Sequence, residues 1–257
     1  MTEVLIDTAT VPMRAVLREP AIPAPHPWAV LLLHGWTSDG ESYQPLADRL
    51  HDLGHTTLAV DLPGHGRSAG DRDRYTYRDF IDAAVAAADF LAARASTTDE
   101  PDGSRPRLAI AGTSLGGFLA VRVAAVRPVA ALALWVPTDF ADDLVDGGAV
   151  MAETSLTPAA LAWRSQPHPP EDSATLRAVA DFPGPMFILE AAEDELVPHQ
   201  TTANYLAAAA LGRTRPDHVT LAAVGHILRA HPDRHTVASA LTAAWLTAVT
   251  PARVPTR

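Results

Sequence analysis

The fold of this chain is decided by the stretch LAIAGTSLGG at residues 108–117. Four apolar residues run into a Gly-x-Ser-x-Gly pattern, and an Ala- and Val-rich segment follows it. This pattern is typical of a sharp turn between a buried strand and a helix, with the serine at its apex. Small residues on both sides allow the close backbone approach that such a turn needs. We therefore predict that the Ser114 hydroxyl projects from the carboxyl edge of a sheet, above a helix N-terminus.

Strands and helices alternate outward from this stretch. We expect strands at residues 4–6, 13–17, 29–33, 56–60, 108–111, 129–136, 186–191 and 219–224. Helices are expected at residues 42–53, 77–95, 115–126, 200–211 and 234–249. Continuous apolar runs such as Ala29–Leu33 indicate strands buried on both faces, and the alternation indicates parallel βαβ units. The chain is thus predicted to be one α/β domain over residues 1–257, with a mostly parallel, doubly wound sheet of about eight strands.

The alternation stops between about Pro137 and Pro183, where the sequence is rich in proline and less regular. We interpret residues 138–183, approximately, as an insertion into the α/β domain. Beyond the last helix, residues 251–257 are expected to form a frayed tail.

Composition excludes several kinds of chemistry. The 257 residues carry a formal net charge of −10, which argues against nucleic acid and weighs against anionic substrates and membrane surfaces. The chain contains no Cys and no Lys, so disulfides, thiolate metal sites, a Cys nucleophile and Schiff-base chemistry are excluded. No apolar run is long enough to span a bilayer, and no secretory signal is recognisable, so we expect a cytoplasmic protein. We expect no cofactor and no metal site.

A serine hydroxyl needs a general base to act as a nucleophile. His226 lies just after the last predicted strand and before the final helix, at the same sheet edge as Ser114. We favour it as the base. His231 is the alternative, although a position at the start of a helix favours exposure to solvent.

The imidazole in turn needs a carboxylate that holds its tautomer. We favour Asp194, which lies in the loop after the strand at residues 186–191, and interpret Glu193 and Glu195 as solvated charges. Asp139, which follows the preceding strand, remains the alternative.

Acyl transfer also needs N–H donors for an oxyanion. Leu115, directly after the nucleophile, offers its backbone N–H, and the loop His34-Gly35-Trp36-Thr37 offers that of Trp36. We expect His34 to order this loop. The Gly-rich segment at residues 61–68 is interpreted as a structural loop, since phosphate-binding and metal-binding spacings are absent.

Taken together, these motifs resemble the α/β-hydrolase superfamily, over residues 28–249. The resembling segments are Leu33–Trp36, Asp61–Ser68, Gly112–Gly117, Asp194–Pro198 and Gly225-His226. The nearest resemblance is to a serine-hydrolase branch with monoacylglycerol lipase-like, cinnamoyl esterase-like and serine aminopeptidase-like members. The resemblance implies a Ser114–Asp194–His226 triad, oxyanion donors at Trp36 and Leu115, and an insertion that caps the pocket.

We therefore expect a serine hydrolase that cleaves a small-molecule ester or acyl substrate. Trp36, Phe140, Leu144 and Trp163 are candidate pocket residues. Two other functions stay open. One is a tailoring lyase or acyltransferase of bacterial secondary metabolism, and the other is a non-catalytic binding protein on the same fold.

Overall fold

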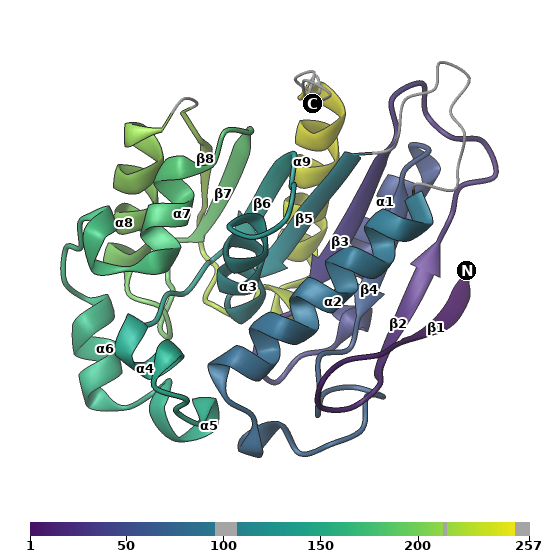
Figure 1. Cartoon of the computed structure of the whole chain (residues 1–257). Coiled ribbons are helices and arrows are strands. Elements are labelled where there is room, and N and C mark those ends of the chain that lie inside the picture. The colour runs from purple at the N-terminus through teal and green to yellow at the C-terminus, as the bar shows by residue number, and fades with distance from the viewer. Residues whose placement is uncertain (96–106, 213–214, 250–257) are drawn as a thin grey trace.

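One eight-stranded sheet runs through the described part of the chain, in the order β1-β2-β4-β3-β5-β6-β7-β8 (Figure 1). The structure is a computed structural model, and it describes residues 1–95, 107–212 and 215–249. The strands are β1 (Thr2–Ile6), β2 (Met13–Arg18), β3 (Trp28–Leu33), β4 (Thr56–Val60), β5 (Arg107–Thr113), β6 (Ala131–Trp135), β7 (Met186–Ala191) and β8 (Asp217–Leu221). Strand β2 pairs antiparallel with β1 and β4, and the other pairs are parallel. The predicted fold class is confirmed.

Helices cover both faces of this sheet. The α-helices are α1 (Gln44–Asp52), α2 (Tyr77–Ala95), α3 (Leu115–Ala124), α4 (Asp142–Asp146), α5 (Met151–Thr154), α6 (Pro158–Arg164), α7 (Ala174–Asp181), α8 (His199–Leu211) and α9 (Pro232–Ala248). Short 3₁₀ turns are η1 (Gly40–Tyr43), η2 (Arg72–Arg74), η3 (Pro170–Asp172) and η4 (Leu228–Ala230). Helices α1 and α9 share one buried cluster with the sheet, and α2, α3, α7 and α8 share the other.

Strand β3 explains why the central strands are apolar throughout. Trp28, Val30 and Leu32 belong to the cluster on the α1/α9 side. Ala29, Leu31 and Leu33 belong to the cluster on the α2/α3 side. Side chains alternate between the two faces of a strand, so a strand covered on both faces needs apolar residues at every position.

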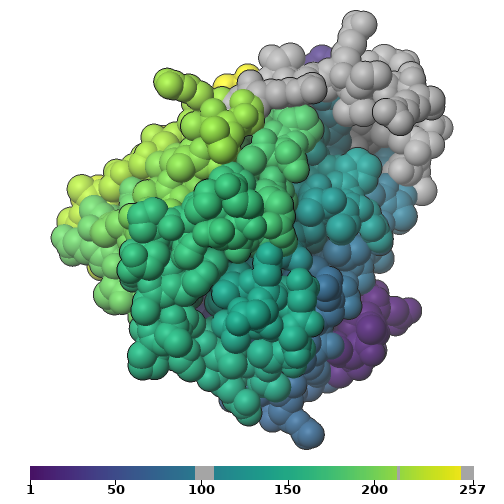
Figure 2. All heavy atoms as spheres, turned by 60° about the vertical axis from the view of Figure 1, so that its left-hand side comes forward, coloured from purple at the N-terminus to yellow at the C-terminus, as the bar shows by residue number. Residues whose placement is uncertain are grey.

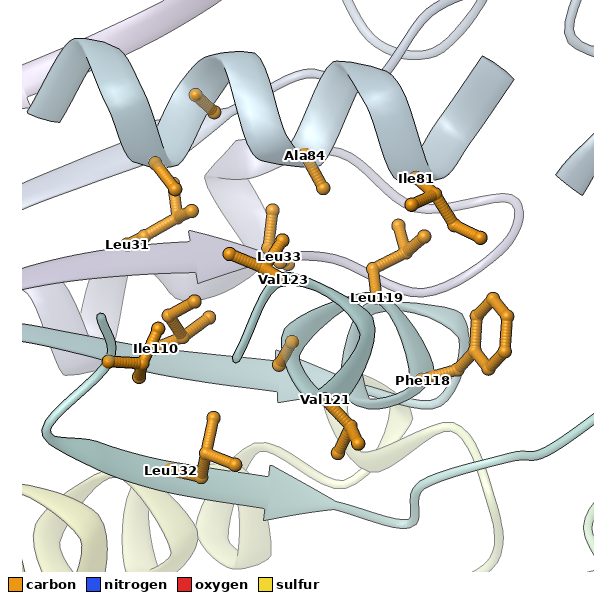
Figure 3. Close-up of a cluster of buried hydrophobic side chains, with 14 of the residues drawn as sticks. Leu31, Leu33, Ile81, Ala84, Ile110, Phe118, Leu119, Val121, Val123 and Leu132 are labelled. Atoms are coloured by element: carbon orange, nitrogen blue, oxygen red, sulfur yellow. The ribbon is translucent and has the colours of Figure 1, made fainter. Parts of the chain in front are cut away.

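The core beneath α2 and α3 holds the nucleophile turn in place. Figure 3 shows Leu33 and Ile110 of the sheet in the same buried cluster as Ala84 of α2 and Leu119 of α3. These side chains are almost fully buried, and complete burial of one Leu or Ile contributes about 1.5–3 kcal/mol. The helix that begins at the nucleophile turn is therefore anchored along its apolar side.

Most predicted elements are found within a residue or two of their expected bounds. The bounds of β4, α2 and β7 agree residue for residue with the prediction. The strand predicted at residues 219–224 instead spans Asp217–Leu221, because a turn with Ala223 at φ 55° follows it. The strand predicted at 129–136 ends at Trp135, because Val136 has φ 42°. The expected tail at residues 251–257 lies outside the described residues.

Between β6 and β7 the chain forms the short helices α4, α5 and α6, the turn η3 and the helix α7. In Figure 2 the green atoms of this segment, called the insertion below, lie on the face turned toward the viewer. Within the described residues, no helix combines the length and apolar character needed to cross a membrane.

Candidate active site

Ser114 occupies the turn between β5 and α3, with φ 53° and ψ −113°. This conformation is rare for a residue with a side chain and costs about 1–3 kcal/mol. Backbone hydrogen bonds hold it. The N–H of Ser114 donates to the Trp135 carbonyl at 2.9 Å, and its own carbonyl accepts from Gly117 N–H at 2.9 Å and Thr138 N–H at 3.3 Å. The turn is thus tied to β6 on one side and to α3 on the other.

Two glycines make this turn possible. A Cβ atom on Gly116 would lie 1.8 Å from the Leu33 carbonyl oxygen, and one on Gly112 would lie 2.1 Å from the Gly116 carbonyl oxygen. Both distances are far below van der Waals contact. The Gly-x-Ser-x-Gly pattern is therefore required by close backbone contacts as well as by the turn itself.

A continuous chain of hydrogen bonds joins Ser114, His226 and Asp194. Ser114 Oγ lies 2.9 Å from His226 Nε2, and His226 Nδ1 lies 2.8 Å from Asp194 Oδ2. An ionised carboxylate can only accept hydrogen bonds, so Nδ1 carries the ring proton and Nε2 is left to accept the Ser114 hydroxyl. This arrangement can withdraw a proton from the hydroxyl as the oxygen attacks an electrophile.

Backbone groups fix the Asp194 carboxylate in turn. Its Oδ1 accepts from the N–H groups of Val197 at 2.7 Å and Leu196 at 3.0 Å. We expected Glu195 to be only a solvated charge, but the structure gives it a specific contact. Its carboxylate accepts from the His226 backbone N–H at 3.1 Å and so holds the histidine loop against the Asp194 loop.

The structure does not bring the alternative acid and base to Ser114. Asp139 is buried, and its carboxylate accepts from Phe140 N–H and Ser173 Oγ, each at 2.8 Å. Burial raises the pKa of Asp139 from 3.8 to about 6. His231 is exposed and precedes α9. Of the two acids, only Asp194 is hydrogen-bonded to His226 in the part of the chain that the structure describes.

The two expected oxyanion donors lie beside the serine. Trp36 and Leu115 both line the cavity that contains Ser114. The described residues show no hydrogen bond from either backbone N–H. Leu115 is the first residue of α3, where a backbone N–H has no partner within the helix.

His34 orders the loop that carries Trp36, as expected. Its Nδ1 lies 2.8 Å from the Gly35 carbonyl, and its Nε2 accepts from Leu62 N–H at 3.0 Å. Full burial lowers the pKa of His34 to about 3, so the ring is neutral at physiological pH.

Hydrogen bonds within the loop and to Gly40 organise the Gly-rich loop at residues 61–68. Asp61 accepts from Gly40 N–H at 2.8 Å and Arg67 N–H at 2.9 Å, and His65 Nδ1 lies 2.9 Å from the Pro63 carbonyl. No cluster of His, Asp and Glu in the described chain has the form of a metal site.

A cavity of about 230 Å³ opens above Ser114. Of the four candidate pocket residues, Trp36 and Phe140 line it, whereas Leu144 and Trp163 do not. Leu144 packs against the hydrophobic core, and Trp163 stacks on the His168 ring at 4.2 Å between centroids. Both side chains therefore pack against other residues and do not line the cavity. The prediction for these two residues was wrong.

The sequence also gave no indication of several residues that line the cavity. They include Tyr43, Thr138, Arg164 and His235. Arg164 is the least expected, because it is a buried cation contributed by the insertion. Its Nη1 donates to Thr138 Oγ1 at 2.9 Å, and its Nη2 donates to the Ser155 carbonyl. Nothing in the local sequence distinguishes this arginine from exposed ones.

Comparison with protein-family models gives a match to the "Alpha/beta hydrolase family" over residues 30–240. Two curated relatives are a thermostable monoacylglycerol lipase of a Bacillus species and a pimeloyl-[acyl-carrier protein] methyl ester esterase of Xanthomonas campestris. The first is 30% identical over 102 residues, which is 40% of this chain and 37% of the lipase. The second is 37% identical over 114 residues, which is 44% of this chain and 38% of the esterase. The matches thus span less than two fifths of either relative.

Solved structures resemble this one over nearly its whole length. Est1E from Butyrivibrio proteoclasticus, solved with ferulic acid, superposes with a TM-score of 0.70 at 19% identity and covers 96% of this chain and all of its own. The Pyrococcus furiosus esterase Pf2001 gives a TM-score of 0.67 at 18% identity and covers 96% of this chain and 91% of its own. At such low identity these similarities establish the fold alone.

Proposed function

The chain belongs to the alpha/beta hydrolase family, and from that premise we propose that it hydrolyses carboxylic esters through Ser114, His226 and Asp194. The lipase and esterase names of its relatives support ester hydrolysis in general terms. The observation that carries the proposal is the pair of hydrogen bonds, 2.9 Å and 2.8 Å long, that links the three side chains. Three separate loops contribute these side chains. Their alignment at hydrogen-bond distance therefore points to catalysis rather than to a role in folding.

In the proposed reaction, Ser114 Oγ attacks the ester carbonyl carbon while His226 Nε2 takes the hydroxyl proton. Asp194 stabilises the imidazolium that results. The backbone N–H groups of Trp36 and Leu115 donate to the oxyanion of the tetrahedral intermediate. Collapse of the intermediate breaks the bond to the leaving oxygen, which receives its proton from His226. Water, activated by the same histidine, then releases the acid from Ser114.

The insertion is proposed to act as a cap over this site. Met151, Leu156 and Arg164 all belong to it, and all line the cavity with Ser114. The closing wall is therefore formed by a segment outside the repeated strand–helix pattern. Variation in such a segment alters the pocket without disturbing the sheet.

A fluorophosphonate probe tests the proposal directly, because it forms a covalent adduct with an activated serine. We expect one adduct on the intact protein by mass spectrometry, lost in Ser114→Ala, together with turnover of p-nitrophenyl butyrate. Ser38→Ala is the matched control, since Ser38 lines the same cavity and has no hydrogen bond to His226 in the described structure. It should keep both the adduct and the turnover.

Two results would contradict this proposal. Without any adduct, the serine is not activated. An adduct without ester turnover would favour the lyase or acyltransferase alternative, in which the same side chains serve a different second step.

A further inference from the structure

Three large aliphatic side chains stand half-exposed at the mouth of the cavity. Leu156 is 56% exposed, Leu196 is 40% exposed and Ile227 is 47% exposed. Each of them also lines the cavity that contains Ser114. We call these three residues the rim. Each rim side chain therefore presents one side to the cavity and another to solvent.

The rim is assembled from three segments that are distant in the sequence. Leu156 lies between α5 and α6 in the insertion, Leu196 lies two residues after Asp194, and Ile227 directly follows His226. Isolated apolar residues on a protein surface need no explanation. Three exposed apolar residues at one cavity do need an explanation. Most other exposed apolar side chains in the described chain, such as Val126 and Leu211, lie away from this cavity.

Backbone contacts hold the rim in place. Leu196 N–H donates to Asp194 Oδ1 at 3.0 Å, and the Ile227 carbonyl accepts from Ala230 N–H at 2.9 Å. The residue before Leu156 donates its N–H to the Met151 carbonyl at 2.9 Å. On Ser155, Leu196 and Ile227 these bonds use only main-chain atoms, so a polar side chain at any of the three rim positions would fit the same backbone. The local fold does not require the aliphatic character of the rim.

The rim continues an apolar surface that begins beside the nucleophile. Phe140, Met151, Val197 and Leu228 are buried and line the interior of the cavity. An apolar chain that starts at Ser114 would pass from these residues to the rim without crossing a carboxylate, since the described lining contains no Asp or Glu.

We propose that the rim binds the outer part of an apolar chain on an ester substrate that is too long for the cavity alone. This inference rests on the proposed ester hydrolysis and names its substrate class, esters with a long alkyl chain. The chain belongs either to the acid or to the alcohol part of the ester. Rim contact removes part of each additional methylene from water, and the expected gain in kcat/KM is roughly twofold per methylene.

Two other occupants fit the observations less well. A stable dimer buries about 800 Å² on each partner, far more than three half-exposed side chains provide. A lipid surface that carries anionic headgroups would be repelled by a chain with a formal net charge of −10. A single apolar chain, by contrast, matches a cavity lined by these three apolar side chains.

Two ester series test the proposal and distinguish its two arms. The first varies the acid, as p-nitrophenyl butanoate, octanoate and dodecanoate. The second varies the alcohol, as butyl, octyl and dodecyl acetate. We expect kcat/KM to rise with chain length in one series, at substrate concentrations below aggregation. A gain that appears only above the aggregation threshold would indicate a lipid surface, and the proposal would fail.

The variant Leu156→Ser/Leu196→Ser/Ile227→Thr removes the rim. We expect its ratio of kcat/KM for the longest and shortest esters to fall by about tenfold relative to wild type. Leu211→Ser and Val126→Ser are the matched controls, because these residues are 72% and 57% exposed and lie away from the cavity. Both controls should keep the wild-type ratio. An unchanged ratio in the rim variant, or an equal fall in the controls, overturns the proposal.

A binding measurement separates this inference from the proposed function. Trp36 and Trp135 line the cavity, so intrinsic fluorescence reports its occupancy. In Ser114→Ala, methyl decanoate should bind at least tenfold more tightly than methyl butanoate, and the rim substitutions should remove most of that difference. This result is expected whether or not Ser114 is catalytic. Equal affinities, or a dimer by light scattering that the rim substitutions dissociate, would show that the rim has another role.

Discussion

Arg164 donates a hydrogen bond from Nη1 to Thr138 Oγ1 at 2.9 Å, and this bond links the end of α6 to the residue that contacts the nucleophile turn. The N–H of Thr138 donates to the Ser114 carbonyl at 3.3 Å, and its carbonyl accepts from Tyr205 Oη at 2.8 Å. Thr138 therefore connects α6, the nucleophile turn and α8. The guanidinium also lies 5.5 Å from the centre of the Phe140 ring, in the wall of the cavity.

Substitution of this buried arginine should destabilise the protein. Arg164→Met leaves the Thr138 hydroxyl and the Ser155 carbonyl without their donor, and we expect a loss of about 2–4 kcal/mol in the free energy of unfolding. Arg177→Met is the control, since Arg177 is half-exposed and pairs with Asp142 on the outside of the insertion. It should cost less than about 1 kcal/mol. Urea unfolding measures both, and equal losses would contradict a special role for Arg164.

The two candidate acids should separate clearly in activity. Asp194→Asn changes the hydrogen bond that sets the His226 tautomer, and we expect kcat to fall by about 10³–10⁴-fold. Asp139→Asn should lower kcat by less than about tenfold, because Asp139 contacts Ser173 and Phe140 rather than His226. Steady-state kinetics on one ester decide the matter. A larger loss in Asp139→Asn than in Asp194→Asn would show that Asp139, and not Asp194, acts on His226.

Asp139 should instead affect how stability depends on pH. Its pKa is about 6 in the folded protein, above the ordinary value of 3.8, because burial disfavours the charged form. Between these two values the folded state retains a proton that the unfolded chain has released. The free energy of unfolding should therefore decrease as pH rises through this window, by about 3 kcal/mol in total.

Asp139→Asn should abolish that part of the pH dependence. The measurement is the difference in unfolding free energy between variant and wild type at several pH values from 4 to 7. Asp143→Asn, which removes an exposed carboxylate from α4, should reproduce the wild-type slope. If Asp139→Asn also shows the wild-type slope, Asp139 is not the source of this pH dependence.

Gly116→Ala should prevent the nucleophile turn from forming. The added Cβ would lie 1.8 Å from the Leu33 carbonyl oxygen, and neither β3 nor α3 can move without disrupting the core. We expect a loss of more than about 4 kcal/mol, or failure to fold. Gly148→Ala is the comparison, because Gly148 has φ 72° with no neighbouring atom within 4 Å. Its cost should be about 1 kcal/mol, from backbone strain alone. Thermal denaturation distinguishes the two variants.

The order of strands and helices was predictable from the sequence, because each element leaves a local trace. The apolar run of β3, the Ala-rich surface of α2 and the Gly-x-Ser-x-Gly turn each span fewer than about twenty neighbouring residues. The errors occurred where a single backbone torsion ends an element, as at Val136 and Ala223. Such torsions depend on contacts that composition does not record.

By itself, the sequence determined the fold class and placed Ser114 and His226 at the same sheet edge, because strand direction and turn chemistry are local properties. The sequence favoured Asp194 over Asp139, but only the tertiary structure shows that Asp194 is the one hydrogen-bonded to His226, since the two acids follow adjacent strands and differ in which loop packs beside them. The tertiary structure also shows that Leu144 and Trp163 do not line the cavity, and that Arg164 and the rim residues do. Those placements depend on contacts between residues that are far apart in the chain. Such contacts form only when the chain folds, so a local stretch of sequence does not reveal them.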